Sequence, residues 1–410
     1  MSRTPPSAWR VVWWFGFVSL AADMVYEGAR SVYGPLLAAL GASAVAVGLV
    51  TGAGEAAALV ARLAFGSLAD RTGRYWSLTI AGYGLTAVCV PLLALAPRLG
   101  AAGLAFASTM ILLERLGKAV RSPSKSALLA HAASAVGRGR GFGVHKALDQ
   151  VGAFAGPLTV AAVVSVGSLW WGVGVLAVPG ALAMLLLLAL RRQVPDPAVY
   201  DDAPAAEHVA PDPPRGWWAS AVGAGLPREF FRYAVAASLT TGALVTFGII
   251  GYHLVTADLL PVASVPLVYA AAMAVEAVAA LGVGAVYDRT GPQVLLVVPV
   301  LVALVPALAL GSALVAVLLG VLAWGFAQGV QDSTVKAVVA ELVEAPRRAT
   351  AYGVFAGVQG LFAVVGGVGA GWLYERSLPA LVVVVVLTQA LALVLLLGTV
   401  RRSARPRPAG

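Results

Sequence analysis

Long uninterrupted apolar segments dominate this sequence, and they limit what the chain can fold into. An α-helix needs about 20 such residues to cross the hydrocarbon of a bilayer, at about 1.5 Å per residue. A membrane β-barrel would instead show short segments of alternating polarity. The sequence predicts twelve helical spans, at residues 11–40, 44–69, 76–97, 101–122, 141–165, 168–190, 228–257, 262–287, 293–312, 314–336, 351–374 and 378–400.

The composition excludes a soluble protein. Hydrophobic residues make up 60% of the 410 positions and charged residues only 11%. Soluble chains carry about 25% charged residues. A chain this apolar cannot cover its surface in water, so we expect an all-α membrane protein rather than a soluble enzyme.

The positive charges lie mainly on one side of the predicted spans. Twenty lysines and arginines, among them Lys118, Arg121 and Lys125, fall at that side, and only Arg98 and Arg376 are clear loop cations at the other. Cytoplasmic loops of membrane proteins carry this excess. We therefore predict a multi-pass protein of the cell (inner) membrane with both termini in the cytoplasm. The net charge of +9 then reflects topology rather than nucleic-acid binding.

A polar stretch rich in Pro, Asp and Ala separates the chain into two parts. Its composition is typical of a linker. We expect an N-terminal six-helix bundle at residues 1–192, a cytoplasmic linker at 193–226, and a C-terminal six-helix bundle with a short basic tail at 227–410.

The two parts are related in sequence. The Asp-Arg-Thr-Gly segment at 70–73 recurs at 288–291, an offset of 218, and Gly156 recurs as Gly366, an offset of 210. A parallel six-plus-six repeat of this kind occurs in one large class of transporters. Twelve helices in two pseudo-symmetric six-helix bundles are the expected architecture.

The segment 66–74, Gly-Ser-Leu-Ala-Asp-Arg-Thr-Gly-Arg, resembles the signature motif of the major facilitator superfamily, and 284–291 resembles a degenerate second copy. The resemblance covers essentially the whole chain. It implies a gate that closes the cytoplasmic side, in which Asp70 accepts hydrogen bonds from the N-terminus of the eleventh span. The predicted gate residues are Gly66, Asp70, Arg71, Gly73, Arg74, Asp288 and Arg289. A simple loop turn with cytoplasmic charges is the alternative.

The fifth span carries a second pattern. Gly143, Gly152, Gly156 and Pro157 follow G-x8-G-x3-G-P, which resembles the motif of the drug:proton antiporters in that superfamily. Small residues at this spacing let helices approach closely. The resemblance favours export, although the Gly-Gly pair that follows in the family is Val160-Ala161 here. Generic packing of a glycine-rich helix is the alternative.

Carboxylates inside membrane spans are costly and therefore candidates for function. In order of preference, we expect proton coupling at Glu27, Asp23, Glu55 and Asp149. Burial favours the protonated form of a carboxyl group, whereas a neighbouring arginine favours the ionised form. An ion-pair cluster that only fixes helix packing remains the alternative.

The resemblance also implies that the first, fourth, seventh and tenth spans line a central cavity. The expected substrate-binding residues on those spans are Tyr26, Arg30, Arg115, Tyr252 and Gln328. For Lys118 and Arg121, a role as interface anchors at the end of the fourth span is an equally good interpretation. The many small and aliphatic residues on these spans suit a hydrophobic or cationic compound better than a sugar.

These observations favour a secondary active transporter that exports a small amphipathic or hydrophobic compound in exchange for protons, by rocker-switch alternating access. The sequence contains no Walker-type phosphate loop and no Cys/His cluster, so neither a cofactor nor a metal is expected. The expected partners are the substrate, protons and the lipid bilayer, and the expected working form is a monomer. A uniporter or symporter for a metabolite or organic anion, and a non-transporting membrane sensor, are the alternatives.

Overall fold

The computed structural model describes residues 6–200, 225–344 and 347–403. All regular elements in these ranges are helical. Eleven segments among them are long and apolar enough to cross a membrane, and the longest, Tyr75–Val136, contains two helices joined at Gly100, whose φ of 53° breaks the helical path. The described chain thus supplies twelve spans, and the predicted twelve-helix fold is confirmed.

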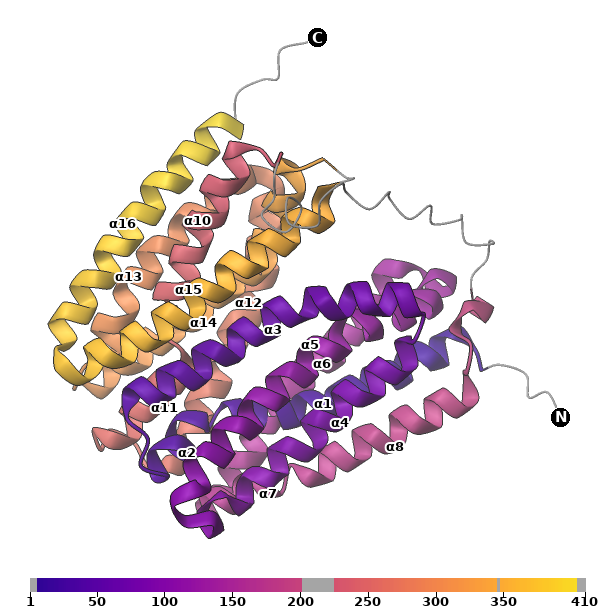
Figure 1. Cartoon of the computed structure of the whole chain (residues 1–410), viewed down its shortest axis with the longest axis horizontal. Helices are drawn as coiled ribbons and strands as arrows, with labels where there is room; N and C mark the ends of the chain where they lie inside the picture. The colour runs from indigo at the N-terminus through magenta and orange to yellow at the C-terminus, as the bar shows by residue number, and fades with distance from the viewer. Residues whose placement is uncertain (1–5, 201–224, 345–346, 404–410) are drawn as a thin grey trace. The chain divides into compact units, whose positions relative to one another are not determined.

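The first six spans are built from eight α-helices and one 3-10 helix (Figure 1). These are α1 (Ala8–Arg30) with α2 (Tyr33–Ala39), α3 (Ala44–Thr72), α4 (Tyr75–Leu92) with η1 (Leu93–Ala102), α5 (Gly103–Val136), α6 (Arg138–Val166), and α7 (Leu169–Gly174) with α8 (Ala177–Gln193). The short helix η2 (Pro197–Tyr200) follows.

The second six spans repeat this order (Figure 1). They are α10 (Arg228–Ala243) with α11 (Phe247–Thr256), α12 (Val265–Thr290) preceded by η3 (Val262–Ser264), η4 (Gly291–Leu296) with α13 (Val297–Ala309), α14 (Leu314–Leu342), α15 (Arg348–Arg376) and α16 (Leu378–Ser403).

The contacts divide the chain into two compact units. Unit 1 comprises Met1–Gly41, Ala57–Ala210 and Pro261–Ala270, and unit 2 comprises Ala42–Ala56, Pro211–Leu260 and Ala271–Gly410. In unit 1, α1 packs against α6 and α8, and α4 packs against α5. In unit 2, α10 packs against α15 and α16, and α13 packs against α14.

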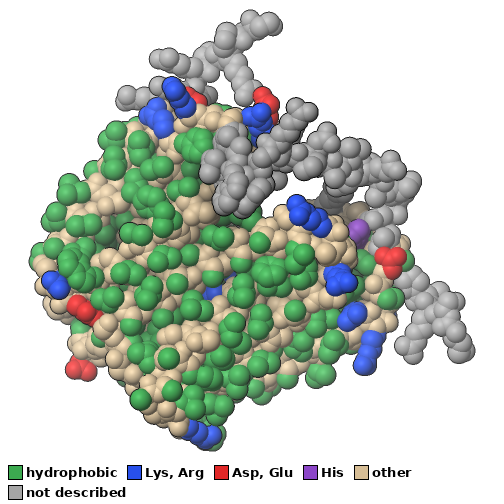
Figure 2. Space-filling model, viewed as in Figure 1, with side chains coloured by type: hydrophobic (Ala, Val, Ile, Leu, Met, Phe, Trp, Pro, Cys, Tyr) green, Lys and Arg blue, Asp and Glu red, His purple; other side chains and the backbone are tan. Residues whose placement is uncertain are grey.

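Large apolar side chains remain exposed on the outer faces of the helices. Val166 is 89% exposed, Leu281 80% and Trp171 75%. Figure 2 shows hydrophobic side chains spread over most of the visible face, and Lys and Arg side chains gathered mainly near helix ends. Exposed apolar surface on this scale is what a bilayer solvates.

The two copies of the signature motif end their helices in the same way. Gly73 and Gly291 both adopt a left-handed φ, 64° and 66°, which glycine reaches without steric cost. The hydroxyls of Thr72 and Thr290 each donate to the carbonyl four residues earlier, at 2.7 and 2.9 Å. The invariant element of the repeat is therefore a helix-terminating turn.

The fourth span is longer than the sequence predicted. Its apolar run ends near residue 122, yet α5 continues to Val136. Arg121 is 4% exposed and lies inside this helix, so its assignment as an interface anchor at the end of the span is wrong. Lys125 also belongs to α5 rather than to a loop. Hydrophobic periodicity does not reveal this extension of the helix, because the inner face of the extension carries paired charges instead of apolar residues.

Two glycines of the fifth-span pattern bring α6 against α1. A Cβ atom on Gly152 would collide with the backbone of Leu20, and one on Gly156 would collide with the backbone of Met24. Gly143 has open space on its side. Only part of the sequence pattern therefore serves close helix packing.

Unit 2 contains the equivalent contact. A Cβ atom on Gly366 of α15 would collide with the backbone of Gly242 on α10. Gly366 corresponds to Gly156 at the offset of 210, and Gly242 corresponds to Met24 at the offset of 218. The repeat thus preserves one close helix contact inside each unit.

We expect Gly156→Ala to lower stability by about 1–3 kcal/mol, because the added methyl forces α6 away from α1. Thermal unfolding of the purified protein in detergent measures the change. Gly143→Ala is the matched control and should be neutral or slightly stabilising, because alanine favours a helix and nothing lies within 4 Å. Equal losses from both substitutions would contradict the packing role.

Candidate functional site

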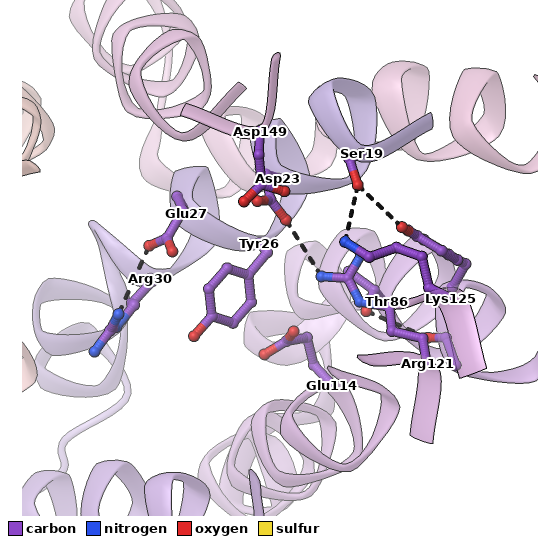
Figure 3. A network of polar contacts seen from close by, with 12 residues as sticks. Ser19, Asp23, Tyr26, Glu27, Arg30, Thr86, Glu114, Arg121, Lys125 and Asp149 are labelled. Atoms are coloured by element: carbon purple, nitrogen blue, oxygen red, sulfur yellow. Dashed lines mark hydrogen bonds and ion pairs between the residues drawn. The ribbon is translucent and has the colours of Figure 1, made fainter. Parts of the chain in front are cut away.

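A network of polar side chains lies inside unit 1, between α1, α4, α5 and α6 (Figure 3). Its centre is an ion pair between Asp23 of α1 and Arg121 of α5, with Nη2 and Oδ1 3.3 Å apart. The two side chains are only 15% and 5% exposed. The Arg121 guanidinium also lies over the ring of Tyr83, 4.5 Å from its centroid. Arg121 is therefore held by a carboxylate and an aromatic face together.

Asp149 of α6 lies beside Asp23 of α1 (Figure 3), and the charge of each carboxyl group acts on the other. Two ionised carboxylates at one site repel each other, which favours a state in which one of them is protonated. Asp149 Oδ2 also accepts a bond from the Lys146 ammonium at 3.2 Å, and the Lys146 side chain is 66% exposed. The pair can thus hold one proton next to an arginine.

Ser19 connects four helices through its hydroxyl. Its Oγ lies 2.8 Å from Nε2 of His145, 3.3 Å from the Tyr83 hydroxyl and 3.1 Å from the Lys125 ammonium, which donates to it. Ser19 is one helical turn before Asp23, on the same face of α1. The contacts of Ser19 fix the positions of the groups around the carboxyl pair.

Glu27 lies one turn further along α1 and has separate partners. Its Oε2 accepts a hydrogen bond of 2.5 Å from the hydroxyl of Tyr269, and the Arg30 guanidinium is 3.8 Å away. Tyr269 belongs to the part of α12 that clusters with unit 1. The structure thus separates Glu27 from the carboxyl pair that Asp23 and Asp149 form.

Tyr26 is surrounded by cations of α5. Its hydroxyl accepts a hydrogen bond from Arg115, and the Lys118 ammonium lies 3.4 Å from the centroid of its ring. Glu114 is fully buried, accepts from the Tyr33 hydroxyl at 3.2 Å, and lies 3.8 Å from Nε of Arg115. Of the expected substrate-binding residues, Tyr26 and Arg115 are in direct contact.

Of the other expected binding residues, Arg30 lies in unit 1 beside Glu27, whereas Tyr252 and Gln328 lie in unit 2, as does Glu55, an expected proton-coupling residue. Tyr252 packs its ring edge-on against Tyr374, with 6.2 Å between the centroids. Gln328 and Glu55 are half-buried on α14 and on the part of α3 that clusters with unit 2. The structure places none of these three in the network of unit 1.

A second polar cluster in unit 2 centres on Thr241. Its hydroxyl donates to Oε1 of Gln331 at 2.9 Å and accepts from Nε2 of Gln359 at 2.9 Å. The cluster is uncharged, in contrast to the network of unit 1.

The gate residues at the end of α3 are exposed, except for the half-buried Gly66. Asp70 accepts a hydrogen bond of 3.2 Å from the hydroxyl of Tyr75 in the same unit. Arg71, Arg74 and Arg289 are exposed, and the side chain of Asp288 lies outside the described residues.

Sequence reasoning missed Ser19, Tyr83 and Tyr269. Ser19, Asp23 and Glu27 recur every four residues on α1, so the spacing of Ser19 is a signal that could have found it. The two tyrosines carry no such signal, because their neighbours on α1 are distant in the sequence. Among the described residues, no three His, Cys, Asp or Glu side chains converge on a point that could hold a metal ion.

Residues 15–330 match the sequence family described as the Major Facilitator Superfamily. The chain belongs to this superfamily. Its members are transporters rather than enzymes, so this protein is a multi-pass secondary transporter of a small molecule.

Uncharacterised proteins of Mycobacterium tuberculosis and Mycobacterium bovis are 50% identical to this superfamily member over 397 residues, which is 96% of this chain and 94% of theirs. An uncharacterised transporter of the superfamily from Methanocaldococcus jannaschii is 29% identical over 146 residues, 35% of each chain.

Solved structures of superfamily transporters share the fold. A nucleoside transporter has a TM-score of 0.73 at 15% identity, with 95% of this chain and 98% of that chain covered. A bacterial homologue of the human lysosomal transporter Spinster also has a TM-score of 0.73, at 16% identity, with 99% and 100% covered.

We expect Asp23→Asn to destabilise this superfamily member by about 3 kcal/mol, because it leaves the buried Arg121 without its carboxylate partner. Denaturant unfolding in mixed micelles measures the loss. The double variant Asp23→Asn/Arg121→Gln should lose less than the sum of the two single variants. Lys146→Gln, which removes an exposed cation, should cost less than about 1 kcal/mol. Strict additivity of the two single losses would contradict the ion pair.

Proposed function

We propose that the protein is a proton-coupled exporter of a small amphipathic compound, and that the Asp23–Asp149 carboxyl pair carries the coupling proton. The observation that supports this proposal is the placement of the two carboxyl groups beside each other and next to Arg121, which lies 3.3 Å from Asp23 inside the helices of unit 1. Ionisable groups at such depth are expensive and mark ion or substrate pathways.

The geometry suggests how a proton changes the site. When both carboxyl groups are ionised, they repel each other and hold Arg121 more strongly. When one of them binds a proton, the two carboxyl groups can share it in a hydrogen bond. The attraction between Arg121 and Asp23 is then weaker. Arg121 then depends more on the ring of Tyr83, 4.5 Å away. Protonation thus alters the link between α1, α4 and α5, which is the kind of differential interaction that shifts a conformational equilibrium.

The fifth-span pattern supports the direction of transport. Gly152 and Gly156 pack against α1 directly beside the carboxyl pair, as the resemblance to drug:proton antiporters suggests. We further propose that the gate acts through Asp70 and its neighbours, that the protein lies in the cell membrane with both termini cytoplasmic, and that a monomer is sufficient.

Glu27 is the second candidate for proton coupling. Its carboxylate accepts a hydrogen bond from the hydroxyl of Tyr269 and lies 3.8 Å from the Arg30 guanidinium. Glu55 is the third candidate. An uncoupled carrier and a non-transporting sensor are the alternative functions; the former moves substrate without a proton requirement and the latter binds without flux.

The first experiment identifies a cargo. Growth in the presence of toxic amphipathic compounds, with and without expression of the protein, selects a compound to which expression confers resistance. That compound is then loaded into proteoliposomes, and its movement is followed after a pH gradient is imposed. A gradient-dependent flux supports coupled transport, gradient-independent flux indicates an uncoupled carrier, and binding without flux indicates a sensor.

We expect Asp149→Asn and Asp23→Asn each to reduce gradient-driven flux at least tenfold, because a single remaining carboxyl group cannot share the proton. Exchange of labelled for unlabelled compound, measured without a gradient, should persist in Asp149→Asn. Asp258→Asn is the matched control, since Asp258 is an exposed loop residue with φ of 52° that asparagine also adopts. Undiminished gradient-driven flux in both site variants would contradict the role of the carboxyl pair as proton carrier. Loss of that flux in Glu27→Gln alone would assign the role to Glu27.

A further inference from the structure

The network in unit 1 contains more positive than negative side chains. Within the described part of the chain, the polar contacts around α1 and α5 of unit 1 involve six cations and four carboxylates. They are Arg30, Arg115, Lys118, Arg121, Lys125 and Lys146, and Asp23, Glu27, Glu114 and Asp149. Even with every carboxylate ionised the network carries a net charge of +2, and a shared proton raises it to +3.

Each carboxylate has its own cationic neighbour. Glu27 lies beside Arg30, Glu114 beside Arg115, Asp23 beside Arg121, and Asp149 beside Lys146, at 3.2 to 3.8 Å. These four pairs use four of the six cations. The surplus charge therefore belongs to Lys118 and Lys125.

Both surplus lysines contact neutral groups. Lys118 lies over the ring of Tyr26, and Lys125 donates to the hydroxyl of Ser19. Lys118 also acts electrostatically on Asp23, and Lys125 on Asp149, but neither lysine forms one of the four ion pairs. Both side chains are half-buried. An ammonium group inside a membrane span is costly unless an anion or water compensates it.

The two lysines share one face of α5. They are seven residues apart, which is about 10.5 Å along a helix, and Arg121 lies between them at three and four residues. The three cations thus form a row that contacts Tyr26, Asp23 and Ser19 of α1, and Figure 3 shows Arg121 and Lys125 of this row. The row adjoins the carboxyl pair to which the coupling proton is assigned.

We propose that the transported compound is an organic anion, and that the positive charges of Lys118 and Lys125 attract its negatively charged group to this row. The inference rests on the proposed transport function and narrows its substrate class. It replaces the expectation of a cationic compound, because the net charge of the network would repel one. The ring of Tyr26 and the aliphatic stems of the lysines offer apolar contact to the rest of an amphipathic acid.

The test measures binding without a pH gradient, so its result is independent of whether coupling occurs. The full-length protein in lipid nanodiscs is titrated with radiolabelled 1-naphthoate. Unlabelled 1-naphthoate, 1-naphthylmethylammonium and 1-naphthylmethanol, which share one aromatic body, are the competitors. We expect saturable binding that the acid displaces at least tenfold better than the ammonium or the alcohol. No saturable binding, or equal displacement by the ammonium, would overturn the proposal.

The variants assign the binding to the row. Lys118→Gln and Lys125→Gln should each weaken 1-naphthoate binding about tenfold, because each substitution removes one positive charge from the row. Lys118→Arg should retain most of it, because the charge remains. Arg98→Gln is the matched control, since Arg98 is an exposed cation near the opposite end of the fourth span. This variant should bind 1-naphthoate as the unchanged protein does. If Lys118→Gln fails to fold, Lys125→Gln and Lys118→Arg still decide the outcome. Unaltered binding in both lysine-to-glutamine variants would refute the assignment.

Discussion

The structure of unit 1 depends on the close contact between α1 and α6. Backbones can approach this closely only where both helices present small surfaces, and Gly152 and Gly156 provide them against Leu20 and Met24. The approach has an electrostatic consequence. It brings the Asp149 carboxyl group of α6 beside Asp23 of α1, where both side chains are largely buried. Helix packing and the meeting of the two carboxyl groups therefore depend on the same glycines.

Charge pairing explains how α5 remains inside the unit along its full length. A helix with four cations between residues 115 and 125 would not be expected to bury one face among apolar helices. Asp23, Glu114 and the rings of Tyr26 and Tyr83 offset most of that cost. The compensation is incomplete at Lys118 and Lys125, and this incompleteness makes the row a candidate for binding rather than a purely structural feature.

The sequence predicted the fold well because the length of an apolar run and the sidedness of charges are properties of single segments. The site was less predictable because it depends on pairs of segments. Asp23 and Asp149 both attracted attention as buried carboxylates, but nothing in either segment shows that they meet. The same reasoning misplaced Arg121, because a cation that follows an apolar run indicates a helix end unless its partner on another helix is known. Tyr269, which donates to Glu27, is 242 positions away in the sequence.

The repeat shows which part of the architecture is structural and which part is specialised. The glycine turn after each motif copy and the close helix contact in each unit occur twice, at Gly73 and Gly291 and at Gly156 and Gly366. Thr241, Gln331 and Gln359 form a neutral cluster in unit 2. They correspond to Asp23, Arg121 and Asp149 of unit 1, at offsets of 218, 210 and 210. The duplicated scaffold thus carries charged side chains at these positions in one unit and neutral ones in the other, so the charges are not needed for the helix packing that the two units share.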